Sequence, residues 1–399
     1  MYFRPSSPAS GRCSWRTERP MRIVVAMSGG VDSSVAAGLM VEAGHEVVGL
    51  TMKLRDATAT EREGRAEGSC CSPDDLRDAA SVCEALGIPH YVVDYRDAFR
   101  KAVMEPFARA YLDGQTPNPC VLCNDHLKFA ALVTRSKALG AAQLVTGHYA
   151  RVVETASGSH ELRAAFDTRK DQSYFLFGLT QKALAFTRFP LGEMSKDEVR
   201  ATALRLGLPT WDKPDSEDIC FVPDGDYARV VTEILTEIGE PRRPSRGALI
   251  DESGRVIGQH DGVHRFTVGQ RKGVGASSEG RRYVLGVDAA TGTINVGPPE
   301  RLMASGLLAR DAHFISGRAP GPDDVVTARI RYRHVGEAAT VRVDGPHLDV
   351  RFLSPVRAIT PGQAVVFSDG DLVLGGAWIV RSQELKPGAD AVSPTASHS

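Results

Sequence analysis

The sequence lacks several features that would assign its class at once. It has no apolar run as long as the roughly 18 residues of a membrane-spanning helix, so it predicts no transmembrane segment. Its 7 cysteines in 399 residues are an odd number, which argues against a disulfide framework and favours buried or reactive thiols in a cytoplasmic protein. A formal net charge of −1 excludes no class of partner, because the local distribution of charge decides binding.

Both ends of the chain lack the periodicity of folded segments. Residues 1–20 are rich in Ser, Pro and Arg without an apolar stretch, so they predict a disordered tail or a start assigned upstream of Met21, and no secretory signal. Residues 387–399 predict a second disordered tail. The chain between them is long enough, at 42% hydrophobic residues overall, for two or three packed domains.

Strand and helix signals alternate through the first half of the chain. This alternation predicts an α/β domain over residues 21–222, a doubly wound parallel sheet with helices on both faces. Ligands bind such sheets at the carboxyl ends of the strands, so we expect the loops at 28–33, 52–54 and 146–149 to converge. The predicted strands are 22–27, 46–52, 90–95 and 143–148.

The second half of the chain is rich in β patterns. Short runs with Gly-rich turns predict a small central β-rich domain over 223–296, including a strand at 264–268. Longer β patterns then predict a C-terminal β-barrel over 297–386, with hairpin turns at Asp344-Gly345 and Asp369-Gly370.

An apolar run leads directly into the segment Ala26-Met-Ser-Gly-Gly-Val-Asp-Ser-Ser34. A glycine turn between a strand and a helix directs backbone N–H groups and a helix N-terminus at one point, which suits a phosphate. The two glycines allow close approach of an anion, the serines add hydroxyl donors, and Asp32 could hold Mg²⁺ between phosphate oxygens. No Gly-Lys-Ser/Thr follows, so this is not a Walker loop. An ordinary glycine turn is the alternative.

Two cysteine segments carry the second chemical signal. Cys123 lies in a proline-containing loop where Asn124 predicts the cap of a helix that begins at about Asp125. The positive end of that helix would favour a thiolate and make Cys123 a nucleophile. Cys220 lies in a loop-like stretch further on. Either cysteine alone could instead be a small buried hydrophobe.

The other cysteines leave alternatives open. Cys83 falls on the apolar side of a helix and predicts a core residue, whereas the pair Cys70-Cys71 lies in a Gly-rich loop and stays ambiguous. Cys120-x-x-Cys123 and Cys220 together offer three thiolates for zinc or an iron–sulfur cluster. No second Cys-x-x-Cys and no nearby His completes a set of four.

Several motifs in order resemble the bacterial tRNA-specific 2-thiouridylase (tRNA-uridine 2-sulfurtransferase) family of PP-loop ATP pyrophosphatases. The resemblance is collinear from about residue 21 to 385. The glycine loop alone occurs in many enzymes, whereas its combination with two cysteine motifs is specific. The matching segments are Ala26–Ser33, Cys70–Ser72 with Asp75, Thr116–Pro119 with Leu122–Asn124, Thr146–Arg151, Lys170–Leu176, Ile219–Phe221, Thr267–Gly273 and Arg331–Arg333.

The resemblance implies an enzyme that replaces the C2 oxygen of the wobble uridine of tRNA with sulfur. It implies adenylation of that oxygen by ATP with Mg²⁺, then sulfur transfer from a cysteine persulfide, giving 2-thiouridine, AMP and pyrophosphate. The implied partners are the anticodon stem-loop of a tRNA and a persulfide donor protein or cysteine desulfurase relay. The implied protein is a cytoplasmic monomer without a membrane partner.

Carried over position by position, the resemblance also implies site residues. Cys123 is the implied nucleophile and Cys220 the persulfide carrier, with a Cys123–Cys220 disulfide formed in each cycle. The implied contacts to the target base are Asn118, Pro119 and Cys120. The implied ATP-binding residues are Ala26, Met27, Ser28, Gly29, Gly30, Val31, Asp32, Ser33, Met52 and Gly147, with Asp32 as the metal ligand. The implied tRNA contacts are His148, Lys170, Asp171, Gln172, Arg331, Tyr332 and Gln363.

Cys120 departs from the family pattern, which often has Asp at this position. A carboxylate there could assist proton transfer near uracil, whereas a thiol does so only weakly near neutral pH. Either that role is dispensable, or Cys120 is a third working thiol.

Two other functions stay open from the sequence. One is an AMP-forming synthetase of the same superfamily that uses ammonia, and the other is a tRNA thiolase or tRNA-binding protein that carries an iron–sulfur cluster. Basic segments of the β domains predict phosphate contacts, with solvated sheet surface as the alternative. These segments are Arg271-Lys272, Arg281-Arg282 and Arg329–Arg333.

Overall fold

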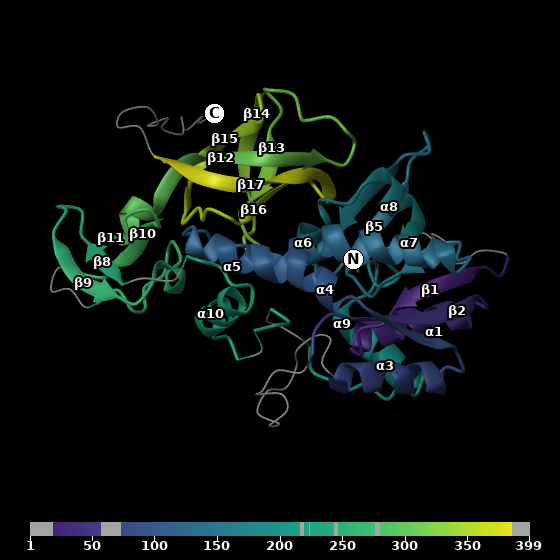
Figure 1. The fold of residues 1–399 in the computed structure, drawn as a ribbon. Helices are drawn as coiled ribbons and strands as arrows, with labels where there is room; N and C mark the ends of the chain where they lie inside the picture. The colour runs from purple at the N-terminus through teal and green to yellow at the C-terminus, as the bar shows by residue number, and fades with distance from the viewer. Residues whose placement is uncertain are drawn as a thin grey trace, which may run out of the picture.

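Three regions follow one another in the computed structural model (Figure 1). An α/β region comes first, then a small β sheet, then a β-barrel that lies beside the α/β region. The residues that the structure describes are 19–56, 73–215, 219–222, 224–242, 246–275 and 280–384. Most of both predicted tails, and the pair Cys70-Cys71, lie outside the described residues.

The α/β region is built on a parallel sheet, as predicted. Among the described residues it has five strands in the order β3-β2-β1-β4-β7. The strand order reverses beside β1, which leaves the ligand crevice of such folds at the carboxyl ends of β1 and β4. The strands are β1 (Arg22–Ala26), β2 (Glu46–Lys53), β3 (His90–Asp94), β4 (Gln143–Val145) and β7 (Thr187–Arg188).

Helices cover both faces of this sheet because the central strand is apolar on both sides. Ile23 and Val25 pack into the core beneath α1, α3 and α9, whereas Val24 points into the core beneath α5 and α7. The helices and turns of this region are α1 (Val31–Glu42), α3 (Pro73–Ala85), α4 (Arg96–Phe99), η1 (Arg100–Met104), α5 (Glu105–Leu112), α6 (Pro119–Cys123), η2 (Asn124–Phe129), α7 (Ala130–Ala138), η3 (Ser173–Leu176), α8 (Gln181–Phe186) and α9 (Lys196–Arg205). No helix among the described residues is long and apolar enough to cross a membrane.

A continuous helical segment, α6-η2-α7, begins earlier than the sequence predicts. Its cap is Asn118, whose Oδ1 accepts the Val121 N–H at 3.4 Å, so the prediction of a cap at Asn124 is wrong. Asn124 is instead buried and donates to the Phe175 carbonyl at 2.9 Å. Pro119 fits the first helical position because it has no N–H to satisfy. The π turn η2 in the middle is a feature often found at functional sites.

The central region is a four-stranded sheet in the order β10-β11-β8-β9 among the described residues. The predicted strand at 264–268 is wrong. Val263 and Phe266, three residues apart, both enter the small core, and this spacing suits a 3₁₀ turn rather than a strand. The elements are α10 (Tyr227–Glu237), which packs on α5, then β8 (Gly247–Ile250), β9 (Val256–His260), η4 (Val263–Arg265), β10 (Tyr283–Asp288), β11 (Thr293–Gly297) and η5 (Pro299–Leu302).

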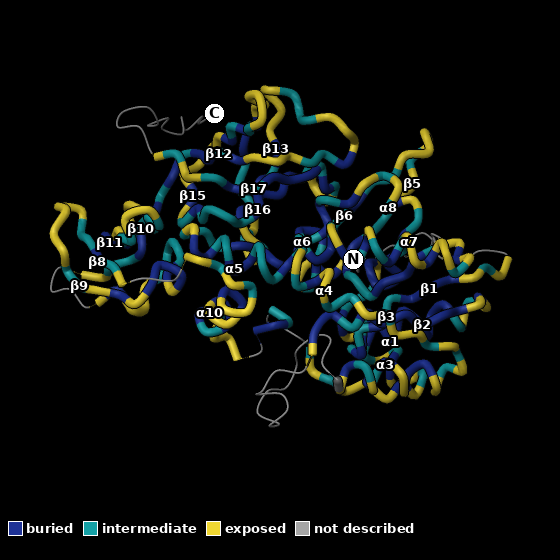
Figure 2. Tube along the Cα trace, viewed as in Figure 1, coloured by how far each residue is buried: buried dark blue, intermediate teal, exposed yellow. Residues whose placement is uncertain are grey.

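The last region is the predicted antiparallel barrel. It closes because β12 pairs with both β15 and β17, and its interior is buried (Figure 2). The hairpin turns at Asp344-Gly345 and Asp369-Gly370 are confirmed. The strands are β12 (Met303–Phe314), β13 (Val326–Arg329), β14 (Glu337–Asp344), β15 (His347–Arg357), β16 (Ala364–Asp369) and β17 (Leu372–Glu384).

An unpredicted hairpin joins the barrel to the α/β region. Strands β5 (Ala150–Glu154) and β6 (His160–Ala164) extend the barrel sheet through the pairing of β6 with β17. Arg151 and Arg163 both reach Asp371 at 2.5 and 2.7 Å. The hairpin follows directly after the loop at 146–149, so it fixes the barrel close to the ligand crevice. The domain boundaries proposed from the sequence stay predictions.

Candidate active site

A cavity of about 1230 Å³ opens at the carboxyl ends of the parallel strands. Its walls come from the glycine loop after β1, the loop after β4, the start of α6 and the turn that holds Cys220. Residues of the barrel strand β13 complete them. Small-molecule pockets usually enclose about 300–1,000 Å³, so this cavity has room for a nucleotide and a second substrate group.

Most of the residues singled out from the sequence line this one cavity. Gly29, Asn118, Arg331 and Gln363 are not part of its lining, although Gly29 and Asn118 belong to its supporting loops. The lining includes Ala26, Met27, Ser28, Gly30, Val31, Asp32, Ser33, Met52, Pro119, Cys120, Cys123, Gly147, His148, Lys170, Asp171, Gln172, Cys220 and Tyr332. The expected convergence of the loops after β1, β2 and β4 is therefore present.

Two glycines allow the loops around the nucleotide end to touch. Gly29 has a φ of +73°, and a side chain there would collide with the backbone of Asp75 at the start of α3. A Cβ at Gly147 would lie 2.7 Å from the backbone of Asp32 and Ser33. Only glycine fits either position, so the loop after β4 rests directly on the glycine loop.

The glycine loop is closed by its own serines. Ser33 Oγ accepts the Ser28 N–H and donates to the Gly30 carbonyl, both at 3.1 Å. The N-cap of α1, Gly30, contributes no side-chain hydrogen bond, so the first N–H groups of this helix are not capped by its N-cap residue. Val31, Asp32 and Ser33 line the cavity there. This arrangement suits an anionic phosphate.

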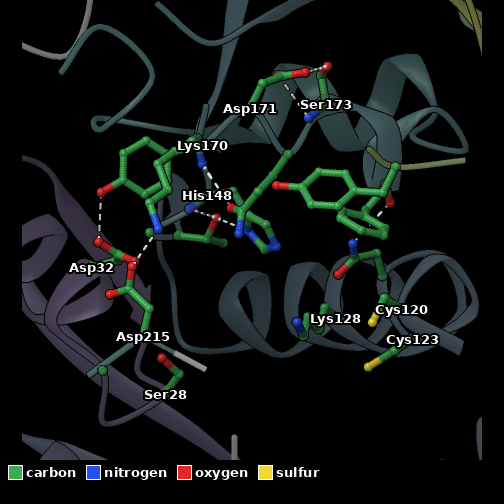
Figure 3. A pocket seen from close by; sticks show the side chains of 18 of the residues that line it. Ser28, Asp32, Cys120, Cys123, Lys128, His148, Lys170, Asp171, Ser173 and Asp215 are labelled. Atoms are coloured by element: carbon green, nitrogen blue, oxygen red, sulfur yellow. Dashed lines mark hydrogen bonds and ion pairs between the residues drawn. The ribbon is translucent and has the colours of Figure 1, made fainter. Parts of the chain in front are cut away.

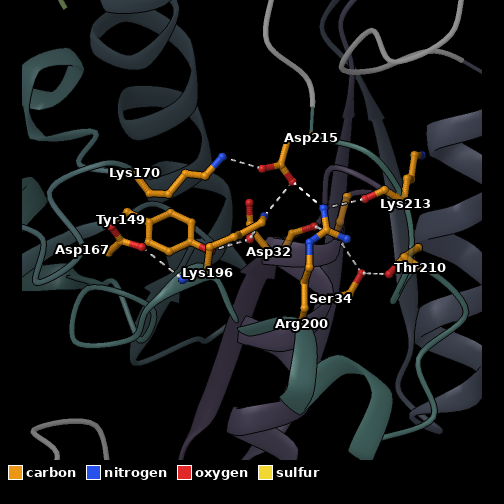
Figure 4. A network of polar contacts seen from close by, with 12 residues as sticks. Asp32, Ser34, Tyr149, Asp167, Lys170, Lys196, Arg200, Thr210, Lys213 and Asp215 are labelled. Carbon is orange, nitrogen blue, oxygen red and sulfur yellow. Dashed lines mark hydrogen bonds and ion pairs between the residues drawn. The ribbon is translucent and has the colours of Figure 1, made fainter. Parts of the chain in front are cut away.

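Asp32 belongs to a network of charges that sequence inspection missed (Figure 4). Its Oδ1 accepts hydrogen bonds from the Tyr149 hydroxyl at 2.8 Å and from Lys196 Nζ at 2.7 Å. Burial and the neighbouring Asp32 raise the pKa of Tyr149, so its phenol stays a donor. The Lys196 side chain is only 8% exposed and also pairs with Asp215 at 2.7 Å. Two segments distant in sequence, at Tyr149 and Lys196, therefore fix the Asp32 carboxylate.

Asp215 gathers the cations on the far side of this network. It pairs with Lys170 at 2.7 Å and with Arg200 at 3.2 Å, in addition to Lys196. Burial alone would raise the pKa of Asp215, but the bonds from Lys170 and Lys196 outweigh it and lower that pKa. The carboxylate therefore stays ionised and holds the lysines beside the glycine loop.

The residues at this end fit a magnesium ion that is shared with phosphate. Mg²⁺ usually takes one or two carboxylates together with phosphate oxygens and water. Asp32 Oδ1 is engaged, but its Oδ2 accepts no hydrogen bond from the described residues. Asp32 would therefore hold the ion through Oδ2, and Ser28 and Ser33 hydroxyls lie beside it in the lining.

Cys120 and Cys123 lie at the other end of the cavity, away from Asp32 and Asp215 (Figure 3). Cys120 is exposed in the first turn of α6, whereas Cys123 is buried one turn later. The field of a helix N-terminus fades within its first turn, so it acts more on Cys120 than on Cys123. The sequence-based placement of Cys123 at the helix start is wrong for the same reason that the cap at Asn124 is wrong.

Cys220 comes to the cavity from a separate turn of the chain. Its carbonyl accepts the Arg55 Nε–H at 3.1 Å. The next residue, Phe221, is buried and packs edge-on against Phe99 and Phe107 at ring distances of 5.7 and 5.0 Å. The aromatic anchor fixes one side of Cys220, and residues 216–218 on its other side lie outside the described residues. Cys83, by contrast, is a core thiol as predicted, and burial raises its pKa to about 11.

A shared metal site at the three thiols has no support from the donor geometry. Within the described ranges, no group of three or more His, Cys, Asp or Glu side chains is placed to hold a metal ion. Cys120, Cys123 and Cys220 line one cavity without forming such a group.

His148 and Lys128 occupy the wall between the two ends. Burial, with a smaller effect of Lys128, lowers the pKa of His148 to about 3, so its imidazole is neutral near pH 7. The ring packs against Phe129 and Phe189, and Nδ1 lies 2.7 Å from Thr146 Oγ1. The His148 imidazole can therefore offer a hydrogen bond to a substrate without adding charge.

Asp171 and Gln172, like Lys170 and His148, are expected tRNA contacts that have internal partners in the structure. Asp171 is buried, accepts hydrogen bonds from the Ala165 and Ser173 N–H groups, and pairs with Arg329 of β13 at 3.0 Å. Gln172 Oε1 accepts the Tyr149 N–H at 3.0 Å. Their contacts with tRNA stay predictions, because the structure tests only what they do within the chain.

The fold and the site together define a PP-loop nucleotide-binding domain of the HUP class joined to two β domains. The family models agree: the tRNA methyl transferase HUP domain matches residues 21–224, its PRC-barrel domain 235–298, and an aminomethyltransferase beta-barrel domain 304–379.

Relatives that cover nine-tenths of this chain carry the name "tRNA-specific 2-thiouridylase MnmA". The protein from Geotalea uraniireducens is 47% identical over 93% of this chain and 98% of its own, and that from Geobacter metallireducens is 47% identical over 90% and 96%. The chain belongs to the tRNA-specific 2-thiouridylase family. The solved NMN synthetase from Francisella tularensis covers 57% of this chain and 80% of its own at 16% identity, but its TM-score of 0.31 is too low to support an argument.

Proposed function

We propose that this protein thiolates C2 of the wobble uridine of tRNA in an ATP-dependent reaction. The main support is the cavity itself, whose lining joins a phosphate-binding glycine loop to Cys123 and Cys220. The family name of the relatives points the same way. A synthetase that uses ammonia would have no need of two thiols facing its nucleotide site.

The first half-reaction takes place at the glycine loop. The C2 oxygen of uracil attacks the α-phosphorus of ATP, and the bond from that phosphorus to pyrophosphate breaks. The N-terminus of α1 and the Ser28 and Ser33 hydroxyls would hold the departing pyrophosphate, and Asp32 would hold Mg²⁺ that neutralises part of its charge. The uracil then carries AMP, a good leaving group, at C2.

The second half-reaction takes place at the cysteines. The terminal sulfur of a persulfide on Cys220, supplied by a donor protein, attacks C2 and displaces AMP. The Cys123 thiolate then attacks the sulfur of Cys220, which releases 2-thiouridine and leaves a Cys123–Cys220 disulfide. A dithiol reductant returns both residues to thiols by supplying two electrons. The alternative route, in which Cys123 releases sulfide before the attack on C2, forms the same disulfide.

The target base has to leave its stack to reach this cavity. A base in an anticodon loop can be turned out at low cost and held on an aromatic ring. Tyr332, near the end of β13, lines the cavity and packs on Phe175 with ring centroids 4.5 Å apart. Arg329 and Arg333 line the same rim and would contact phosphates. The barrel therefore supplies the side of the cavity that faces the RNA.

The test is thiolation of an unmodified tRNA with ATP, Mg²⁺ and a persulfide donor, by wild type, Cys123→Ser and Cys220→Ser. We expect 2-thiouridine from the wild type and a loss of more than about 1,000-fold in either variant, as for removal of a covalent nucleophile. Full activity in Cys220→Ser would contradict the persulfide route. AMP release on a small carboxylic acid without tRNA would instead indicate a synthetase, and stoichiometric iron after anaerobic purification a cluster enzyme.

A further inference from the structure

The loop that precedes the cysteine helix is held from outside its own domain. Residues 115–118 lead into α6, and they are contacted by both β domains. Thr116 Oγ1 donates to Thr267 Oγ1 of the central region at 3.2 Å, and the Thr116 N–H donates to the Pro361 carbonyl of the barrel at 2.9 Å.

Gln363 provides two further external contacts to this loop. Its side-chain Nε2 donates to the Thr116 carbonyl at 2.9 Å and to the Pro117 carbonyl at 3.4 Å. The backbone of Gln363 is fixed in the barrel, because its carbonyl accepts the Ile379 N–H at 2.8 Å. The amide therefore spans from the residue just before β16 to two consecutive carbonyls of the loop.

The neighbouring residue, Gly362, lies close against the same loop. Gly362 has a φ of +88°, and a Cβ there would lie 2.9 Å from Gln115 Cβ and 3.0 Å from the Thr116 nitrogen. Two adjacent barrel residues therefore contact the same loop. Gln363 does so through its amide, and Gly362 allows the close approach because it has no side chain.

The loop itself offers few backbone hydrogen bonds that could fix its conformation. Pro117 and Pro119 lack N–H groups, so they cannot make the turn hydrogen bonds that would orient the carbonyls before them. Asn118, between them, caps α6 through the Val121 N–H. The orientation of the Thr116 and Pro117 carbonyls decides where Asn118 points, and hence where Cys120 and Cys123 enter the cavity.

We propose that Gln363 is a positioning residue for the cysteine helix. This inference rests on the proposed function, because it assigns Gln363 a role in the sulfur-transfer step. A displacement of a reacting group by about 1 Å can cost on the order of 100-fold in rate.

The test separates this role from a contact to tRNA through rate and affinity. Gln363→Met keeps the length of the side chain and removes its donor. We expect the single-turnover thiolation rate at saturating tRNA to fall by about 10–100-fold, with the Kd for tRNA changed by less than about threefold. Gln259→Met, on an exposed position of β9, is the matched control and should change neither. A raised Kd with an unchanged rate at saturation would overturn the proposal in favour of a tRNA contact.

A second measurement does not depend on activity. Hydrogen exchange of the amides at 120–123 should be faster in Gln363→Met and in Gly362→Ala than in the wild type and Gln259→Met. Gly362→Ala would displace the same loop through its Cβ, and it keeps the test available should Gln363→Met fold poorly. Unchanged exchange in both variants would overturn the proposal. If the wild type does not thiolate tRNA, the proposed function fails. The exchange result still decides whether Gln363 and Gly362 position the cysteine helix.

Discussion

The two ends of the cavity differ in how their charged side chains are paired and in which region holds their loops. At the nucleotide end, Asp32 is held by Tyr149 and Lys196 within a network of paired carboxylates and cations. At the cysteine end, Asp125 has an Oδ1 that is buried without a hydrogen-bond partner among the described residues. The nucleotide end is locked from within the α/β region, and the cysteine end is held by contacts from the barrel. The position of Asp32 therefore depends on contacts within one region, whereas the loop before Cys120 and Cys123 depends on contacts between regions.

Apart from the two cysteine variants, the largest effect should come from a side chain added where the two loops of the nucleotide end touch. Gly147→Ala places a Cβ 2.7 Å from the backbone of Asp32 and Ser33, so the glycine loop has to move. We expect kcat/KM for ATP to fall by about 100-fold or more. Gly286→Ala, where the nearest atom would be 3.8 Å away, is the control and should leave ATP use unchanged. Pyrophosphate release under steady-state conditions measures both, and equal activities would show that the loops do not need to touch.

The charge network predicts the next largest effect. Lys196→Met leaves Asp32 and Asp215 without their shared cation in a largely buried position. Loss of one partner of a buried pair costs about 3–5 kcal/mol, and the partial exposure of both carboxylates reduces this to about 2–3 kcal/mol.

Urea denaturation of Lys196→Met measures this cost. Lys182→Met, at an exposed position of α8, should change the free energy of unfolding by less than about 0.5 kcal/mol. A stability of Lys196→Met equal to that of the control would mean that the network does not stabilise the nucleotide end.

The raised pKa of Asp125 predicts a pH dependence of the free energy of unfolding that originates at the cysteine end. Burial raises the pKa of Asp125 to about 7, so the folded chain binds a proton there that the unfolded chain releases near pH 4. The stability that this proton contributes is complete below about pH 4 and is lost as the pH rises to about 7. We expect Asp125→Asn to remove this loss. Its free energy of unfolding, compared with that of the wild type, should be higher at pH 8 than at pH 4 by about 1–3 kcal/mol.

The measurement for Asp125→Asn is the free energy of unfolding from pH 4 to 8, beside wild type and Asp323→Asn at an exposed position. Parallel curves for all three proteins would refute a raised pKa at Asp125.

The smallest effect concerns the outer rim. Arg331 is exposed beside the cavity, and its loss should weaken tRNA binding by about 1 kcal/mol and reduce the slope of log K against log salt by about 1. Arg22→Ala, at the exposed amino end of β1, should leave the slope unchanged. Filter binding at several salt concentrations measures both, and an unaltered slope in Arg331→Ala would remove Arg331 from the tRNA surface.

The difference between the two ends also explains what the sequence could predict. The glycine loop, the parallel sheet and the barrel follow from local patterns, since the residues that form them are neighbours in sequence or repeat with a regular period. The partners of Asp32 could not be found in this way, because Lys196 lies 164 residues away and reads locally as a helix start. The cap at Asn118 had a signal in the sequence, because the proline that follows it, Pro119, favours the first position of a helix. The contact of the Asn124 side chain with the Phe175 carbonyl, by contrast, joins residues 51 positions apart and has no local signal.

The measurement that tests the account most directly separates the two ends in one experiment. Pyrophosphate release and 2-thiouridine formation are followed together with tRNA, ATP, Mg²⁺ and a persulfide donor. We expect Cys123→Ser and Cys220→Ser to release pyrophosphate in a tRNA-dependent burst while forming no 2-thiouridine, because adenylation needs only the nucleotide end. Loss of the burst in both variants, or 2-thiouridine from Cys220→Ser, would contradict a cavity with two chemically separate ends.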